Sequence, residues 1–194
     1  QPGMPKYKDL NGDGIIDTND RTMIGRGLPI HTGGFTNNFE YKGFDLSVFF
    51  QWSYGNDVLN ANRLFFDSGF QKKRELNQYA SYTNRWTPEN PNSDIPAATN
   101  SSSNLVISSR VVEDASFLRL KTVTLGYTVP KTFLKKYKID NARLYVAAQN
   151  LWTITGYSGY DPEVSIRSGG LTPGLDFSSY PRALSVSFGI NLGF

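Results

Sequence analysis

The sequence predicts an all-β fold whose antiparallel strands form part of the wall of a transmembrane β-barrel. Three observations lead to this prediction. Five segments alternate apolar and polar residues, a pattern that gives a strand one apolar face and one polar face. Alternately short and long connections join these segments, and no run of about 18 apolar residues is present. Five strands are too few to close a barrel, so we expect the last five strands of a larger one.

The composition is compatible with such a wall. Aromatic residues make up 14% of the chain, as expected for strands with aromatic girdles at their ends. Cysteine is absent, which excludes disulfide and thiol chemistry. The net charge is only +3 and no basic stripe is present, so we expect no nucleic-acid partner. The chain begins at Gln1 rather than at Met, which suggests a processed chain or a fragment.

The first two predicted strands form a hairpin. Residues 32–41 alternate, Lys42-Gly43 is a tight turn signal, and residues 44–54 form the clearest spanning strand. Six residues of this strand share the face that we expect to contact lipid, with two aromatic residues at one end: Phe44, Leu46, Val48, Phe50, Trp52 and Tyr54.

Three further strands are predicted in the second half of the chain. Residues 117–129 alternate cleanly from Val123 onward, but Arg119 and Lys121 fall on the apolar parity. We therefore expect that end of the strand to project beyond the bilayer. A helical turn predicted near residues 133–136 precedes the strand at 142–152. The final strand spans 184–194, and its expected lipid-facing residues include Leu184, Val186, Phe188 and Ile190.

The lengths of the connections orient these strands in the membrane. Outer-membrane barrels have short periplasmic turns and long extracellular loops. Lys42-Gly43 and residues 130–141 are therefore expected to be periplasmic. Residues 55–114, residues 156–180 and the chain before Leu28 are expected to be extracellular. This division separates an extracellular loop, residues 1–29, from a strand region, residues 30–194.

Residues 9–20 match the twelve-residue EF-hand loop. Gly14 occupies the sharp turn, and the oxygen ligands fall at the required spacing: Asp9, Asn11, Asp13, the carbonyl of Ile15, Asp17 and Asp20. The pattern predicts Ca²⁺ rather than Mg²⁺, because Mg²⁺ requires octahedral geometry and retains its waters. A solvated turn without metal is the alternative. Gly25, Gly27 and Pro29 leave no room for a long following helix, so we expect a stapling site rather than a calcium sensor.

No catalytic set is evident, and we expect a protein that is not an enzyme. His31, the only histidine, has no nucleophile beside it in the sequence. Asp161 and Glu163 are two acids in a proline-bearing loop, which favours a structural or partner-binding role over glycoside hydrolysis. Aromatic residues in the long loops are candidates for partner or substrate contact, with packing inside the loops as the alternative: Trp86, Tyr157 and Tyr160.

The order of these motifs resembles the C-terminal part of SusC/RagA-type TonB-dependent transporters. The matching stretches cover nearly the whole chain: residues 8–14, 33–34, 41–46, 84–88, 149–151, 159–163 and 180–182. The resemblance implies a barrel of about 22 strands with an internal plug, in the outer membrane of Bacteroidetes-type bacteria. It also implies import of glycans, oligosaccharides or peptides, a SusD-like lipoprotein lid, and contact with TonB through an N-terminal part that this sequence lacks.

The resemblance further implies that the final strand is the signal for barrel assembly, carried by Phe188, Ile190, Leu192 and Phe194. A second function class stays open, namely a secreted, calcium-stabilised β-sandwich that binds carbohydrate. The two classes differ in what covers the apolar face of residues 44–54, which is lipid in a barrel and a second sheet in a sandwich. The sequence does not reveal the transported substrate or the identity of the lid.

Overall fold

The computed structural model describes residues 2–69, 77–100, 102–166 and 173–194. It contains two compact units. Unit 1 comprises Gln1–Leu28, Asp57–Asp114 and Glu163–Ser179, and unit 2 comprises Pro29–Asn56, Ala115–Pro162 and Tyr180–Phe194. The sequence-based border between residues 29 and 30 lies one residue from the first border of the units. The sequence-based division assigned both long connections to the strand region. The structure instead groups most of both connections with the N-terminal segment in unit 1.

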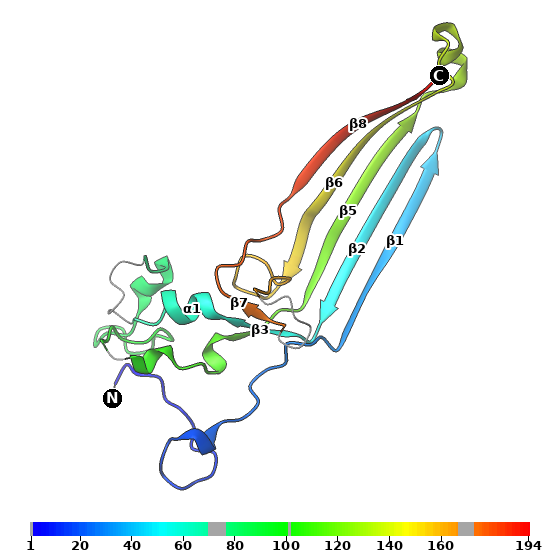
Figure 1. Ribbon diagram of the computed structural model, residues 1–194. Coiled ribbons are helices and arrows are strands. Elements are labelled where there is room, and N and C mark those ends of the chain that lie inside the picture. The colour runs from blue at the N-terminus through cyan, green and yellow to red at the C-terminus, as the bar shows by residue number, and fades with distance from the viewer. Residues whose placement is uncertain (1, 70–76, 101, 167–172) are drawn as a thin grey trace. The chain divides into compact units, whose positions relative to one another are not determined.

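Unit 2 is a five-stranded antiparallel sheet with the strand order β1-β2-β5-β6-β8 (Figure 1). Its strands are β1 (His31–Tyr41), β2 (Phe44–Tyr54), β5 (Phe117–Thr128), β6 (Asn141–Thr155) and β8 (Ser185–Gly193). All five predicted strands are confirmed, and their ends differ from the predicted ends by three residues or fewer. Each pairs with its neighbour in antiparallel register.

The β1–β2 hairpin closes with the tight turn that the sequence predicts. Lys42 and Gly43 have φ angles of 48° and 88°. Two consecutive left-handed residues are typical of a type I′ turn, whose twist matches that of the paired strands.

The β5–β6 connection contains the predicted helical turn, which is confirmed as α2 (Lys131–Leu134) followed by the 3-10 turn η5 (Lys135–Tyr137). Lys138 ends it with a φ of 56°. Its N–H donates to the Lys135 carbonyl at 3.3 Å, and the Ile139 N–H donates to the Leu134 carbonyl at 3.4 Å. These paired bonds form a Schellman motif. We call the end of the sheet that carries both short connections the turn end.

A β-bulge in β5 changes the face assignment made from the sequence. At Lys121 the register with β2 shifts by one residue. Leu118 and Leu120 therefore lie on the apolar face, opposite Trp52 and Phe50, and Arg119 turns to the polar face. The prediction that Arg119 lies on the apolar face is wrong. It assumed uninterrupted alternation, and a bulge inserts one residue that reverses the parity beyond it. The expected projection of this strand end beyond the bilayer stays a prediction.

The apolar face of the sheet is open. Phe35 and Phe50 stack at a ring-centroid distance of 4.8 Å, and Phe44 lies 4.6 Å from Tyr127. Large side chains on this face nevertheless stay exposed, including Phe188 at 83% and Phe39 at 59%. A β-sandwich would bury such a face under a second sheet. The exposed face contradicts the sandwich alternative and fits a wall that contacts lipid.

Unit 1 has its own small core. Its sheet has the order β4-β3-β7, with β3 (Asp57–Asn60), β4 (Val112–Asp114) and β7 (Leu175–Asp176). Helix α1 (Ala61–Phe66) follows β3 directly, and the 3-10 turns are η1 (Thr18–Asp20), η2 (Ala80–Asn84), η3 (Ser102–Leu105) and η4 (Ser109–Val111). Val58, Leu64 and Val111 are buried. No helix in the described parts of the chain is long and apolar enough to span a bilayer.

Candidate functional site

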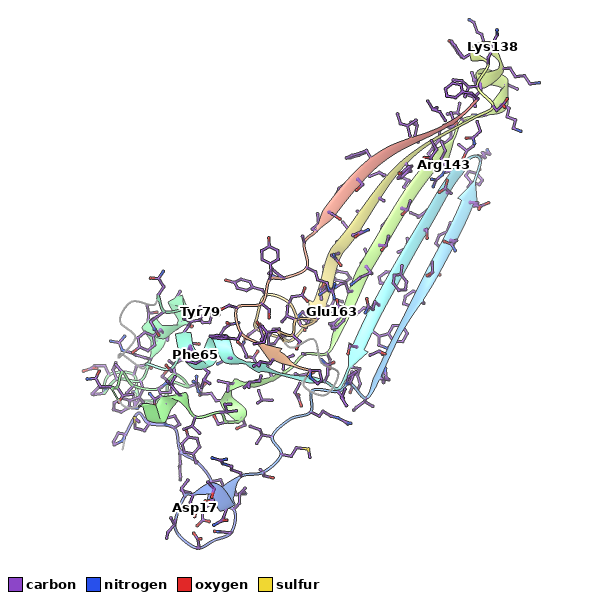
Figure 2. The ribbon with its side chains drawn as sticks, in the orientation of Figure 1. Asp17, Phe65, Tyr79, Lys138, Arg143 and Glu163 are labelled. Atoms are coloured by element: carbon purple, nitrogen blue, oxygen red, sulfur yellow. The ribbon has the colours of Figure 1, made fainter. Side chains whose placement is uncertain are left out.

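The polar face of the sheet carries an ion pair near the turn end. Arg143 of β6 donates from Nε to Asp45 Oδ1 of β2 at 3.0 Å, and from Nη2 to the other carboxylate oxygen. Gly126 of β5 lies between them, and a Cβ at that position would collide with both charged groups. Figure 2 labels Arg143 on its strand. This bidentate pair joins β2 to β6 across the glycine of β5, with only part of each side chain exposed to solvent.

A substitution at Gly126 tests this arrangement. Gly126→Ala is expected to lower the free energy of unfolding by about 0.5–1 kcal/mol, because the partly exposed ends of the Asp45–Arg143 pair must move to admit the methyl group. Gly193→Ala is the control, since a Cβ there would meet only the Asn141 side chain, at 3.6 Å or more. Equal stability of the two variants in denaturant titration would contradict the expected collision.

Asp161 is a buried centre of contacts at the other end of the sheet. Arg119 donates from Nη2 to Asp161 Oδ1 at 2.5 Å, and the Arg182 backbone N–H donates to Asp161 Oδ2 at 2.9 Å. Arg119 is 2% exposed and Asp161 is 4% exposed. One carboxylate thus links β5 to the segment that leads into β8. It also brings together two motifs that the sequence treated separately, residues 159–163 and 180–182. The sequence proposed Asp161 for partner or substrate contact, whereas the structure gives its carboxylate internal partners.

A small cavity of about 180 Å³ adjoins this ion pair. Its remaining lining residues come from β6 and from the two loop motifs: Asn150, Thr153, Thr155, Tyr160, Pro162 and Arg182. Tyr160 is 79% exposed. Among the loop residues proposed from the sequence, Tyr160 therefore presents its ring to the surroundings and stays a candidate for contact.

The other proposed loop residues are more enclosed. Tyr157 is buried, and its ring lies so close to Gly159 that a Cβ would not fit there. Trp86 is half-buried in unit 1, where its indole lies beside Gly3, and the Gly3 carbonyl accepts the Ala97 N–H at 2.8 Å. Glu163 is also half-buried. The geometry around Tyr157 and Trp86 fits packing within the loops, the alternative that the sequence left open.

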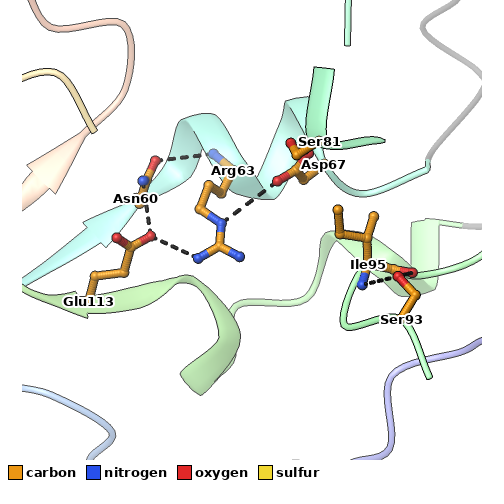
Figure 3. Close-up of polar contacts among 7 residues, drawn as sticks. All are labelled: Asn60, Arg63, Asp67, Ser81, Ser93, Ile95 and Glu113. Atoms are coloured by element: carbon orange, nitrogen blue, oxygen red, sulfur yellow. Dashed lines mark hydrogen bonds and ion pairs between the residues drawn. The ribbon is translucent and has the colours of Figure 1, made fainter. Parts of the chain in front are cut away.

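Unit 1 contains a polar cluster that sequence reasoning missed (Figure 3). Arg63 of α1 donates to Glu113 of β4 at 3.0 Å and lies 3.8 Å from Asp67. Asn60 caps α1 by accepting the Arg63 N–H at 3.1 Å, and its amide donates to Glu113 at 3.1 Å. Burial lowers the pKa of the neighbouring Arg110. An asparagine directly before an apolar helical stretch is an N-cap signal that would have predicted the start of α1.

The predicted calcium loop is ordered by its own carboxylates. Asp9 accepts the N–H groups of Gly12 and Gly14 at 2.6 and 2.8 Å. Asp20 accepts those of Leu10 and Asp17 at 2.7 and 2.8 Å. These backbone donors, that of Asp17 first, lower the pKa of the Asp20 carboxyl.

The remaining predicted ligands shape the same loop. The Asn11 side chain accepts the Asp13 N–H at 3.0 Å, and Asp17 caps η1 by accepting the Asn19 N–H at 2.7 Å. Ile15 is exposed. In the described part of the chain, no three Asp, Glu, His or Cys side chains form a cluster able to hold a metal ion. The loop has the turns and the carboxyl groups that a hard cation needs, but binding would require these carboxyl groups to converge further.

The final strand presents the residues proposed as an assembly signal. Phe188, Ile190 and Leu192 lie on the apolar face of β8 and are exposed, and Phe194 follows the strand with 84% exposure. Their role as a signal stays a prediction.

His31 lies at the start of β1, where its Nδ1 accepts the Trp52 indole N–H at 3.1 Å and its ring stacks on Tyr54. That position among aromatic rings fits a girdle residue.

Taken together, the long antiparallel strands, the open apolar face and the polar face with its ion pair define the class of protein. This sheet is a section of the wall of an outer-membrane β-barrel.

Comparison with known proteins identifies the family. The chain is 40% identical over its whole length to TonB-dependent receptor P3 of Formosa agariphila, and 29% identical over 97% of its length to TonB-dependent receptor SusC of Bacteroides thetaiotaomicron. Among solved structures, it is similar to the RagAB peptide importer in its closed-closed state, with a TM-score of 0.78, 29% identity and 98% of the chain covered. No protein-family model matches.

The chain is a segment of a SusC/RagA-type TonB-dependent transporter and belongs to the bacterial outer membrane. It spans about a fifth of the length of these relatives, namely 19% of the Formosa receptor, 17% of SusC and 21% of the RagAB chain. Both named sequence relatives are TonB-dependent receptors, and the named structural neighbour is a peptide importer.

Proposed function

We propose that this chain forms five strands of the barrel wall, with two extracellular loops, in a transporter that imports glycans, oligosaccharides or peptides across the outer membrane. The observation that carries this proposal is the two-faced sheet, whose exposed apolar face suits lipid and whose polar face suits a barrel interior. The rest of the barrel, its plug and a TonB-contacting N-terminal part complete the working protein. The 194 residues alone are not expected to transport.

Substrate class is best decided in cells. The gene for the full transporter is deleted, and uptake of labelled oligosaccharides and of labelled peptides is measured with and without complementation. A selective loss of one class that complementation restores identifies the substrate class. Unchanged uptake of both classes would overturn the proposed import function.

A SusD-like lipoprotein is proposed as the partner that closes over the extracellular loops. Tyr160 is the best single residue with which to test this contact, because its ring is 79% exposed beside the Asp161 motif. Tyr160→Ala in the full-length transporter is expected to reduce co-purification of the lipoprotein or substrate uptake several-fold, with assembly unchanged. Tyr137→Ala is the matched control, since this tyrosine is 68% exposed at the turn end of the sheet. If both variants retain the lipoprotein and uptake, Tyr160 has no role in contact.

The loop at residues 9–20 is proposed to bind Ca²⁺ on the extracellular side and to staple the N-terminal segment. Asp9, Asn11, Asp13, Asp17, Asp20 and the Ile15 carbonyl would supply the oxygens. The support is the EF-hand spacing together with the lowered pKa of the Asp20 carboxyl and the turns at Gly12 and Gly14.

Removal of the proposed ligands tests the calcium site directly. In the full-length protein, a chelator is expected to accelerate proteolysis before Ile30 several-fold, and added Ca²⁺ is expected to restore protection. The double variant Asp9→Asn, Asp13→Asn is expected to be cleaved rapidly with or without Ca²⁺. Asp94→Asn, at an exposed acid outside the loop, should behave as the wild type. Identical cleavage with chelator and with Ca²⁺ would show that Ca²⁺ binding does not protect this segment from proteolysis.

A further inference from the structure

The turn end of the sheet carries a group of lysines that has no part in the proposed import function. The β5–β6 connection contains Lys131, Lys135, Lys136 and Lys138, and all four are exposed. Lys42 is exposed in the β1–β2 turn at the same end. The exposed acidic residues beside these turns are Glu40 and Asp140, so the lysines outnumber them five to two. Short basic turns of this kind present a local positive charge toward whatever lies beside them.

Two of these lysines occupy backbone conformations that disfavour a side chain. Lys42 has a φ of 48° in a type I′ turn, and Lys138 has a φ of 56° at the end of a Schellman motif. Glycine or asparagine is favoured at both positions, because a Cβ is crowded in the left-handed region. Lysine at two such positions, on two separate turns at one end of the sheet, indicates that the charged side chains contribute something that glycine would not.

Aromatic side chains accompany the lysines. Tyr41, Phe133 and Tyr137 are 69%, 70% and 68% exposed. Lys42 Nζ lies 5.1 Å from the centroid of the Tyr41 ring. Aromatic rings beside lysines, whose apolar stems end in a charge, are typical of the boundary between hydrocarbon and lipid headgroups.

The turns are anchored next to the lipid-facing surface. Leu134 is buried beneath the exposed turn, and Tyr41 pairs with Phe44, the first residue of the apolar face of β2. Leu144 and Ile190 continue this exposed apolar face across β6 and β8 at the same end. Figure 2 shows Lys138 at the tip of the β5–β6 connection. The basic turns are thus continuous with the surface that contacts hydrocarbon.

We propose that the turn end of the sheet is a headgroup-binding rim that recognises anionic glycerophospholipids. The lysines at 42, 131, 135, 136 and 138 bind lipid phosphate oxygens, while Tyr41, Phe133 and Tyr137 lie at the hydrocarbon boundary. Short turns of outer-membrane barrels are periplasmic, so the bound lipid belongs to the periplasmic leaflet. Electrostatic attraction between lysines and an anionic leaflet adds to the non-specific contact of the apolar face with acyl chains.

Lipid binding by the full-length transporter tests the rim. The delipidated protein in detergent is titrated with phosphatidylglycerol and with phosphatidylcholine of the same acyl chains, and bound lipid is measured by native mass spectrometry. We expect at least about tenfold tighter binding of phosphatidylglycerol. Replacing all five lysines by glutamine should abolish this preference. The variant Lys6→Gln, Lys8→Gln, at exposed lysines of unit 1, should keep it.

A single substitution separates lipid binding from folding. Lys138→Gly removes one charge and relieves the left-handed backbone, so its thermal midpoint in detergent should rise. Its preference for phosphatidylglycerol should fall about two- to fivefold.

An unchanged preference in the folded five-lysine variant overturns the proposal. A stronger lysine-dependent preference for lipid A phosphates than for phosphatidylglycerol would also overturn it, because it would place the turns at the opposite leaflet.

Discussion

Asp161→Asn is expected to destabilise the full-length transporter by about 3–5 kcal/mol. The substitution leaves the Arg119 guanidinium, which is 2% exposed, without the carboxylate that lies 2.5 Å from its Nη2. Removing one partner of a buried ion pair is far more costly than the loss of a surface ion pair. The free energy of unfolding is measured by denaturant titration of the purified protein, and assembly in cells by heat-modifiable gel mobility.

A second substitution separates charge from packing. The double variant Arg119→Met, Asp161→Asn removes both charges of this pair, and the asparagine oxygen can still accept the Arg182 N–H. Its loss of stability should be clearly smaller than the sum of the two single losses. Asp94→Asn, at an exposed acid, is the control and should stay within about 0.5 kcal/mol of the wild type. If Asp161→Asn also stays within that range, the Arg119–Asp161 pair does not stabilise the wall.

Arginine at Val48 is expected to impair assembly strongly, whereas arginine at Ser47 is expected to be tolerated. Val48 pairs with Val123 on the apolar face, and Ser47 pairs with Thr124 on the polar face. A charged side chain on the lipid face near the bilayer midplane costs about 2–4 kcal/mol, and one facing the interior of the barrel keeps its water. The two positions are consecutive in β2 and therefore lie at nearly the same depth in the bilayer. They differ mainly in the face of the sheet to which the side chain points.

The measurement for this pair is the amount of heat-modifiable barrel in the outer membrane. Val48→Thr is a useful companion, since it changes polarity without adding charge and should assemble almost normally. Equal assembly of Val48→Arg and Ser47→Arg would show that the two faces are assigned wrongly.

Much of the sheet follows from local pattern. Alternation along residues 44–54 sets a two-faced strand whose bounds the structure reproduces, and Lys42-Gly43 sets the turn before it. These predictions succeed because a strand side chain repeats every two residues and a type I′ turn has its own residue preferences. The apolar face needed no knowledge of distant residues, since alternation alone defines it, whereas the structure decided that no second sheet covers it.

The sequence by itself determined the five strands, their apolar face, the two tight connections and the EF-hand spacing of residues 9–20. Only the tertiary structure decided that Lys121 is a bulge, that Arg119 turns to the polar face, and that Asp161 holds it there. It also decided that most of both long connections form unit 1 with the N-terminal segment. The physical reason is range. Alternation and turn preference are local properties. The partners of the Asp161 carboxylate lie 42 and 21 positions away, and the register of β5 depends on β2, which is further away still.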